Sequence, residues 1–163
     1  MHPGRVALLQ GMPIFGAIDE STLDFLVARA RAHEVAAGRT FFHEGDVASG
    51  MFVLEAGRVA VARQAAGVDL VLCELGPGDC FGEMALMDLR PRSATVRALA
   101  DCRAFEIGPD DLLELFQRDI AQFTLIQMNM GREVCRRLRA ADDRLFALGA
   151  GRQPSTAPHA GVS

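Results

Sequence analysis

The chain has no tryptophan, no tyrosine and no long apolar run. A helix that crosses a bilayer needs about 20 consecutive apolar residues, and no segment approaches that length. The first residues, Met-His-Pro-Gly-Arg, also lack the apolar stretch of a signal peptide. We therefore expect a cytoplasmic protein that does not contact a membrane.

An excess of positive charge is missing as well. The 17 Lys and Arg residues are outnumbered by 21 Asp and Glu, which gives a formal net charge of −4. Proteins that bind nucleic acid ordinarily show the opposite balance, so we expect no nucleic-acid partner. The length of 163 residues and the 50% hydrophobic content indicate one folded globular domain.

Residues that hold metals or act as nucleophiles are few and dispersed. The cysteines are Cys73, Cys80, Cys102 and Cys135, and the histidines are His2, His33, His43 and His159. No Cys-x-x-Cys pair and no zinc-ligand spacing occurs among them, and they support no Ser-His-Asp arrangement. We expect free, mostly buried thiols, no metal and no enzymatic activity.

The remaining residues show two kinds of periodicity. Near the N-terminus, Asp19 or Ser21 can cap a helix whose apolar residues fall three and four apart. From about residue 35, short apolar stretches alternate with glycine-containing turns, which is typical of antiparallel strands joined by tight hairpins. The stretches are 40–42, 51–54, 59–61, 68–72, 94–99 and 103–107, and the turns are 44–46, 55–57, 65–67 and 76–79.

Two helices are expected after the strands. Pro109, followed by Asp110 and Asp111, is well placed at the start of the first. The second runs from about Asp119 to Leu148 with an apolar seam. The resulting α+β fold is an antiparallel, jelly-roll-like β-roll (34–108) with N-terminal helices, a short phosphate-binding helix and C-terminal helices (109–148). One domain (1–148) is then followed by a disordered tail (149–163), rich in Gly, Ala, Pro and Ser.

The segment from Gly78 to Val96 carries the chemistry. Gly82 permits close backbone approach, and a helical turn over 83–87 offers free N–H groups to an anion. Arg92 and the Ser93 hydroxyl can bind phosphate oxygens as the chain returns to a strand. A carboxylate at Glu83, beside an anion site, suits the hydroxyls of a ribose. Sugar and phosphate together indicate a nucleotide.

Several motifs in this order and spacing resemble the cyclic-nucleotide-binding domain family over residues 6 to 148. They are Glu44-Gly45-Asp46, Gly57-Arg58-Val59, Gly76-Pro77-Gly78-Asp79, Phe81-Gly82-Glu83 and Pro91-Arg92-Ser93-Ala94-Thr95-Val96. The resemblance implies cAMP or cGMP as ligand, with Glu83 on the ribose 2′-hydroxyl and Arg92 on the cyclic phosphate. The ligand-binding residues it implies are Phe81, Gly82, Glu83, Met84, Ala85, Arg92, Ser93, Ala94 and Asp142.

In the family, the C-terminal helix folds over the pocket and contacts the base. By register the candidates are Arg139, Ala141, Asp142 and Asp143. Ser93 beside the arginine favours cAMP, whereas an acidic helix residue can accept hydrogen bonds from guanine, so cGMP stays open. We interpret the cluster Arg132, Arg136, Arg137 and Arg139 as a solvated face, with contact to a phosphate or a partner as the alternative.

The route from ligand to output is the last expectation. The DNA-binding branch of the family continues into a helix-turn-helix module, whereas only a short tail follows the long helix here. We therefore expect a stand-alone receptor, monomer or homodimer, whose C-terminal helix rearranges and signals to an unknown effector protein. The alternative is a structural or dimerising module of the same fold without a ligand. A cupin-like enzyme is disfavoured because no His-rich cluster is present.

Overall fold

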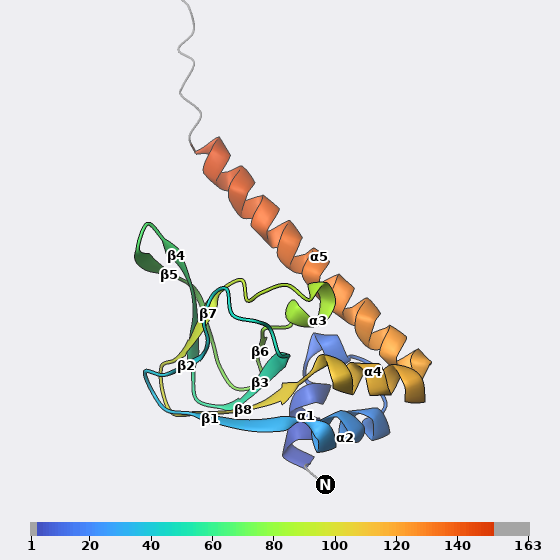
Figure 1. Cartoon of the computed structure of the whole chain (residues 1–163). Helices are drawn as coiled ribbons and strands as arrows, with labels where there is room; N and C mark the ends of the chain where they lie inside the picture. Colours follow the sequence, from blue (N-terminus) through green and yellow to red (C-terminus); the bar gives the residue numbers. More distant parts are fainter. Residues whose placement is uncertain (1–2, 152–163) are drawn as a thin grey trace, which may run out of the picture.

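The computed structural model describes residues 3–151 (Figure 1). The helices are α1 (Pro3–Gln10), a 3-10 turn η1 (Pro13–Phe15), α2 (Glu20–Arg29), α3 (Ala85–Asp88), α4 (Pro109–Arg118) and α5 (Ile120–Ala150). The strands are β1 (Arg31–Val35), β2 (Thr40–Phe42), β3 (Met51–Ala56), β4 (Val59–Ala65), β5 (Val68–Leu75), β6 (Cys80–Phe81), β7 (Thr95–Ala98) and β8 (Cys102–Ile107).

The strands form two four-stranded antiparallel sheets, in the orders β1-β8-β3-β6 and β2-β7-β4-β5. In Figure 1 the sheets make the roll, and α1, α2, α4 and the start of α5 gather at one end of it. Each of the four predicted turns contains a glycine with positive φ: Gly45, Gly57, Gly67 and Gly78. The predicted α+β roll with helices at both chain ends is therefore confirmed.

The hydrophobic core has two parts. One lies between the sheets and is rich in aromatic rings, with Phe52 stacked on Phe81 at a centroid distance of 5.3 Å. Phe41 and Phe42 are half-buried and pack against this cluster. The other part joins the helices to β3 and β8 through buried leucine, isoleucine and methionine side chains. The loop between β6 and β7, which carries the predicted site, contacts both cores, because Phe81 at its start belongs to the first and Leu86 packs against the second.

Two strands were not predicted. In β1 the sequence Arg-Ala-His-Glu-Val has only two apolar residues, and the segment becomes a strand because all five residues pair with β8. In β6 the two residues Cys80 and Phe81 pair with β3. Neither segment is long or apolar enough to give a strand signal of its own.

Among the described residues, helix α5 packs into the helical core only with its first half. Ile126, Asn129 and Met130 are buried there, and Asn129 Nδ2 donates hydrogen bonds to the carbonyls of Ile14 (3.1 Å) and Gly16 (2.9 Å). Beyond Met130 the helix passes α3 and projects past the roll (Figure 1). It includes Gly149 and Ala150, which we expected in the tail, and residues 152–163 lie outside the described range. In the described part of the chain, no helix combines the length and apolar character needed to span a membrane.

Candidate functional site

A pocket of about 490 Å³ opens between the β6–β7 connection, the β4–β5 hairpin and α5. Its lining from the first of these is Cys80, Phe81, Gly82, Glu83, Met84, Ala85, Asp88, Arg90, Pro91, Arg92, Ser93 and Ala94. The other walls are Phe42, Val61, Leu72, Cys73, Leu75 and Val96 from the roll, and Arg136, Arg137, Ala140, Ala141 and Arg144 from α5. Eight of the nine residues predicted to bind the ligand therefore line one cavity.

Arg92 lies at the bottom of this pocket and is only 5% exposed. Its Nη1 donates to the carbonyl of Gly82 (3.2 Å) and its Nη2 to Oγ of Ser49 (3.3 Å). The guanidinium carbon lies 4.0 Å from the ring centroid of Phe42, in a cation–π contact. The guanidinium is thus held by neutral groups, and no carboxylate within residues 3–151 forms an ion pair with it.

The electrostatic state of Arg92 follows from its burial. Desolvation lowers the pKa of the guanidinium below its ordinary value, and the negative charges of Glu106 and Asp46 act in the opposite direction. A buried cation without a bound anion is costly unless it is paired. An anionic group that enters the pocket would therefore be attracted to Arg92.

Gly82 makes the close approach of Arg92 possible. Its φ of +76° lies in the left-handed region, which favours glycine. A Cβ at this position would overlap Nη1 of Arg92 and lie 3.2 Å from the carbonyl oxygen of Gly50. The predicted need for glycine here is therefore both conformational and steric.

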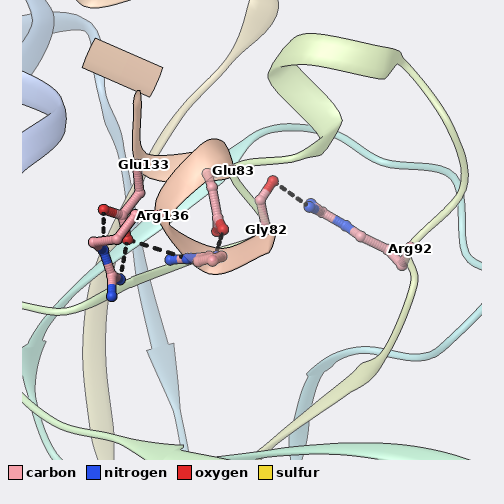
Figure 2. A network of polar contacts seen from close by, with 6 residues as sticks. Gly82, Glu83, Arg92, Glu133 and Arg136 are labelled. Atoms are coloured by element: carbon pink, nitrogen blue, oxygen red, sulfur yellow. Dashed lines mark hydrogen bonds and ion pairs between the residues drawn. The ribbon is translucent and has the colours of Figure 1, made fainter. Parts of the chain in front are cut away.

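Glu83 is the acidic wall of the pocket, and 6% of it is exposed. Its Oε1 accepts a hydrogen bond from Nη1 of Arg137, which comes from α5. Arg137 Nε also donates to Glu133 (3.1 Å), and Glu133 accepts from Arg136 as well. Figure 2 shows Glu83 beside this helix network and Gly82 beside Arg92. Within the predicted site, Glu83 therefore contacts α5, whereas Arg92 contacts Gly82 and Ser49.

Backbone donors complete the site. No hydrogen bond among the described residues uses the N–H groups of Gly82, Glu83 or Met84, nor those of Ser93 and Ala94. Free N–H groups, a buried guanidinium and the exposed Ser93 hydroxyl suit an anion, and the Glu83 carboxylate suits a hydroxyl donor. The cavity can therefore bind a ligand that carries both groups.

Helix α5 meets the pocket through one of the four residues that were candidates for contact with the base. Ala141 lines the cavity, whereas Asp142, Arg139 and Asp143 are exposed and do not. Arg136 and Arg137 of the arginine cluster are exposed, in agreement with the interpretation of a solvated face, but both also line the cavity. Of the nine residues predicted to bind the ligand, Asp142 is the one outside the pocket lining.

Two residues that hold Arg92 were not predicted. Phe42 falls in the apolar stretch 40–42, which predicts a strand, and nothing in the sequence shows that its ring would meet Arg92 in a cation–π contact. Ser49 carries no motif at all. Its hydroxyl reaches Arg92 because Arg92 N donates to the carbonyl of Asp46 (2.8 Å), which brings the two loops together.

The cysteines differ from expectation in part. Cys102 is buried and Cys80 half-buried, but Cys73 and Cys135 are exposed, so the thiols are not mostly buried. Burial raises the pKa of Cys80, which lines the pocket, from 9.0 to about 11. Within residues 3–151, His, Cys, Asp and Glu side chains form no group of three that could hold a metal ion.

Comparison with known proteins places these features in context. Residues 32–119 match the sequence model of the family described as cyclic nucleotide-binding domain. The chain is 30% identical over 141 residues to the cyclic AMP receptor protein of Thermus thermophilus, and the match covers 86% of this chain and 63% of that protein. The chain therefore spans less than two thirds of that relative.

Two solved structures are similar. The catabolite activator protein of Thermus thermophilus aligns with a TM-score of 0.75 at 29% identity, over 85% of this chain and 63% of that one. The regulatory domain of Toxoplasma gondii PKA, solved with cAMP, aligns with a TM-score of 0.66 at 27% identity, over 69% of this chain and 43% of that one.

Proposed function

Because this chain belongs to the cyclic nucleotide-binding domain family, we propose that it is a receptor for a cyclic mononucleotide and not an enzyme. In this proposal Arg92 and the free N–H groups around Gly82 and Ser93 bind the cyclic phosphate. Glu83 accepts the ribose 2′-hydroxyl. Phe81, Met84, Ala85 and Ala94 form the walls around them.

One observation carries the proposal. Arg92 is a buried cation in a pocket wall, held by a carbonyl, a hydroxyl and an aromatic ring, with no carboxylate in an ion pair among the described residues. A structural ion pair between Glu83 and Arg92 is the alternative for a domain that has lost its ligand. Glu83 is instead paired with Arg137, so Arg92 keeps its donors for an incoming phosphate.

We favour cAMP as the ligand. Ser93 beside the arginine supports it, and so does the presence of a cyclic AMP receptor protein and a cAMP-bound regulatory domain among the similar proteins. The α5 wall gives cGMP a specific argument as second candidate. Arg144 and Arg137 offer donors only, and guanine presents two acceptors, O6 and N7, where adenine presents one acceptor and one donor.

We further propose that α5 transmits the signal to an effector protein. The helix carries Arg137 to the carboxylate that the ribose would use, so ligand and helix share one group. A ligand that binds one arrangement of α5 better than another shifts the population towards it, in proportion to that difference in affinity. The partner that reads α5 would be a separate polypeptide or a second copy of the chain.

The alternative, a dimerising module without a ligand, has its own observation. Val134, Leu138, Leu145 and Leu148 are 39% to 67% exposed on the second half of α5. They are spaced three and four residues apart around Ala141, as in a coiled-coil seam. This surface is compatible with a homodimer that also binds nucleotide. It therefore bears on the oligomeric state and does not distinguish a receptor from a module without a ligand.

Calorimetric titration of one purified sample with cAMP and with cGMP tests the function. Saturable binding of either supports a receptor, and binding of neither at millimolar concentration favours the structural module. Hydrogen exchange on free and bound protein tests the output, because protection across residues 134–146 should rise with ligand. Unchanged exchange in that segment would leave α5 as a scaffold only.

A further inference from the structure

A second buried charge lies behind the phosphate end of the pocket. Glu106, in the centre of its sheet on β8, is 5% exposed. Its Oε2 lies 2.8 Å from Nε2 of His33 on the edge strand β1. Its Oε1 is buried and, within residues 3–151, has no hydrogen-bond partner. A buried carboxylate with one unpartnered oxygen requires an explanation, because such groups are costly.

Arg92 has the matching irregularity. Its Nε is also buried and has no partner among the described residues. Nη1 and Nη2, by contrast, donate to the Gly82 carbonyl and to Ser49 Oγ. Two buried groups of opposite charge thus each have one buried polar atom without a partner among the described residues.

Short-range contacts connect the two groups. A Cβ on Gly50 would lie 3.1 Å from Oε1 of Glu106. The carbonyl oxygen of Gly50 approaches Gly82, whose own carbonyl accepts a hydrogen bond from Arg92 Nη1. The ring of Phe52 contacts His33 on one side, at a centroid distance of 5.1 Å, and the Arg92 guanidinium at 5.6 Å. Only one turn of backbone and one aromatic ring therefore separate the His33–Glu106 pair from Arg92.

We propose that Glu106, held by His33, is an internal counter-charge to Arg92 with which the ligand phosphate competes. In the empty pocket the carboxylate compensates the buried guanidinium through a medium of low dielectric constant. A phosphate then approaches a nearly neutral pair of charges and is attracted less than it would be by Arg92 alone. Glu106 is thus a positioning and affinity-setting residue outside the pocket wall. The inference rests on the proposed nucleotide site.

The charged groups around the pair fit this role. Arg31 lies opposite Glu106 in the β1–β8 register but is exposed, and Asp46 is a half-exposed carboxylate whose backbone holds Arg92. Glu34 and Arg103 oppose one another three residues further along the two strands. Among these, Glu106 is the one buried carboxylate, so its charge is the least screened by water.

Calorimetric titration of Glu106→Gln with cAMP and with cGMP tests the inference. We expect Kd to fall by about three- to tenfold for both nucleotides, because the removed charge acts on the phosphate that they share. Glu106→Asp keeps the charge and should keep wild-type affinity. Glu34→Gln, the same change at an exposed position of β1, should have no effect. A gain in affinity distinguishes the proposed role from structural damage, which only weakens binding.

A second variant keeps the inference testable if Glu106→Gln does not fold. His33→Lys leaves the buried carboxyl in place and puts a permanent cation beside it, so it should also tighten binding of both nucleotides. If the wild type binds and neither variant binds more tightly, the inference is overturned and the proposed function stands. If the wild type binds neither nucleotide, the proposed function falls and this inference with it.

Discussion

Arg137 of α5 donates a hydrogen bond to the buried carboxylate of Glu83, 54 residues away in the sequence. The pair joins the end of β6, where the sugar of a nucleotide is expected, to the half of α5 that projects from the roll. A carboxylate has two oxygens and can accept from a guanidinium and a hydroxyl together. In the proposed function, ligand binding and helix position would therefore be connected through the Glu83 side chain.

Removing this connection should loosen α5 in the free protein. For Arg137→Gln we expect amide exchange across residues 134–146 to speed up by up to about fivefold, because a partly exposed ion pair contributes ~0.2–1 kcal/mol. Arg139→Gln is the matched control, since Arg139 lies on the same helix and does not line the pocket. Equal exchange in both variants would show that the ion pair does not hold the helix.

Arg92→Ala should weaken nucleotide binding and leave the fold intact. Loss of a hydrogen bond to a charged group costs ~1.5–3 kcal/mol, which corresponds to at least tenfold and up to a hundredfold or more in Kd. Arg97→Ala removes an arginine whose partner is the exposed Asp69, outside the pocket, and serves as the control. Titration with unchanged affinity in Arg92→Ala would contradict the assignment of the phosphate site.

Glu83→Gln should weaken binding of a cyclic ribonucleotide more than binding of its 2′-deoxy analogue. The carboxylate accepts the sugar hydroxyl more strongly than an amide does, by roughly a factor of two in hydrogen-bond strength, and the deoxy ligand cannot report that difference. The measurement is the ratio of the two Kd values in wild type and variant. An identical ratio would mean that Glu83 acts through the fold and through Arg137.

Cys80 should alkylate far more slowly at pH 8 in the native protein than in the unfolded one. With a pKa raised to about 11 by burial, its thiolate fraction is about a hundredfold lower than that of a thiol titrating at 9.0. A variant in which the three other cysteines are serine isolates the signal, and the same variant in denaturant supplies the reference rate. Comparable rates in native and unfolded protein would show that the thiol is not protected.

The same group makes stability depend on alkaline pH. A folded-state pKa above the unfolded value means that the protonated thiol is favoured by folding, so its contribution is complete below pH 9.0 and is lost as pH rises towards 11. The difference between the free energies of unfolding of wild type and Cys80→Ala should therefore shrink as pH rises over this interval. A difference that stays constant between pH 9.0 and 11 would contradict the raised pKa of Cys80.

The residues of the candidate pocket in the β6–β7 connection could be predicted because they are local in the sequence. Gly82, Glu83 and Arg92 lie within one loop, and the chemistry of that loop follows from residue type and spacing. The roll was predictable for a similar reason, since each hairpin carries its own turn glycine. Strand β1 was not, because its polar sequence forms a strand only when paired with β8.

The prediction of which α5 residues face the pocket depended on how a long helix is rotated about its axis. Successive residues on a helix point about 100° apart, so an error of one residue moves a side chain off the facing surface. Ala141 lines the pocket and Asp142 does not, which is an error of that size. The partner of Arg137 was also beyond sequence reasoning, because Glu83 belongs to a distant segment and no periodicity links the two.

Helix α5 is held at Asn129 and Met130 and free of the helical core beyond them, which makes its second half a lever arm. The segment from residue 131 to 150 is about 30 Å long at 1.5 Å per residue. A tilt of about 10° at its base would therefore move its tip by about 5 Å, the length of one helical turn. A small rearrangement at Arg137, near the fulcrum, would reach a partner at Ala150 as a displacement large enough to change which side chains meet.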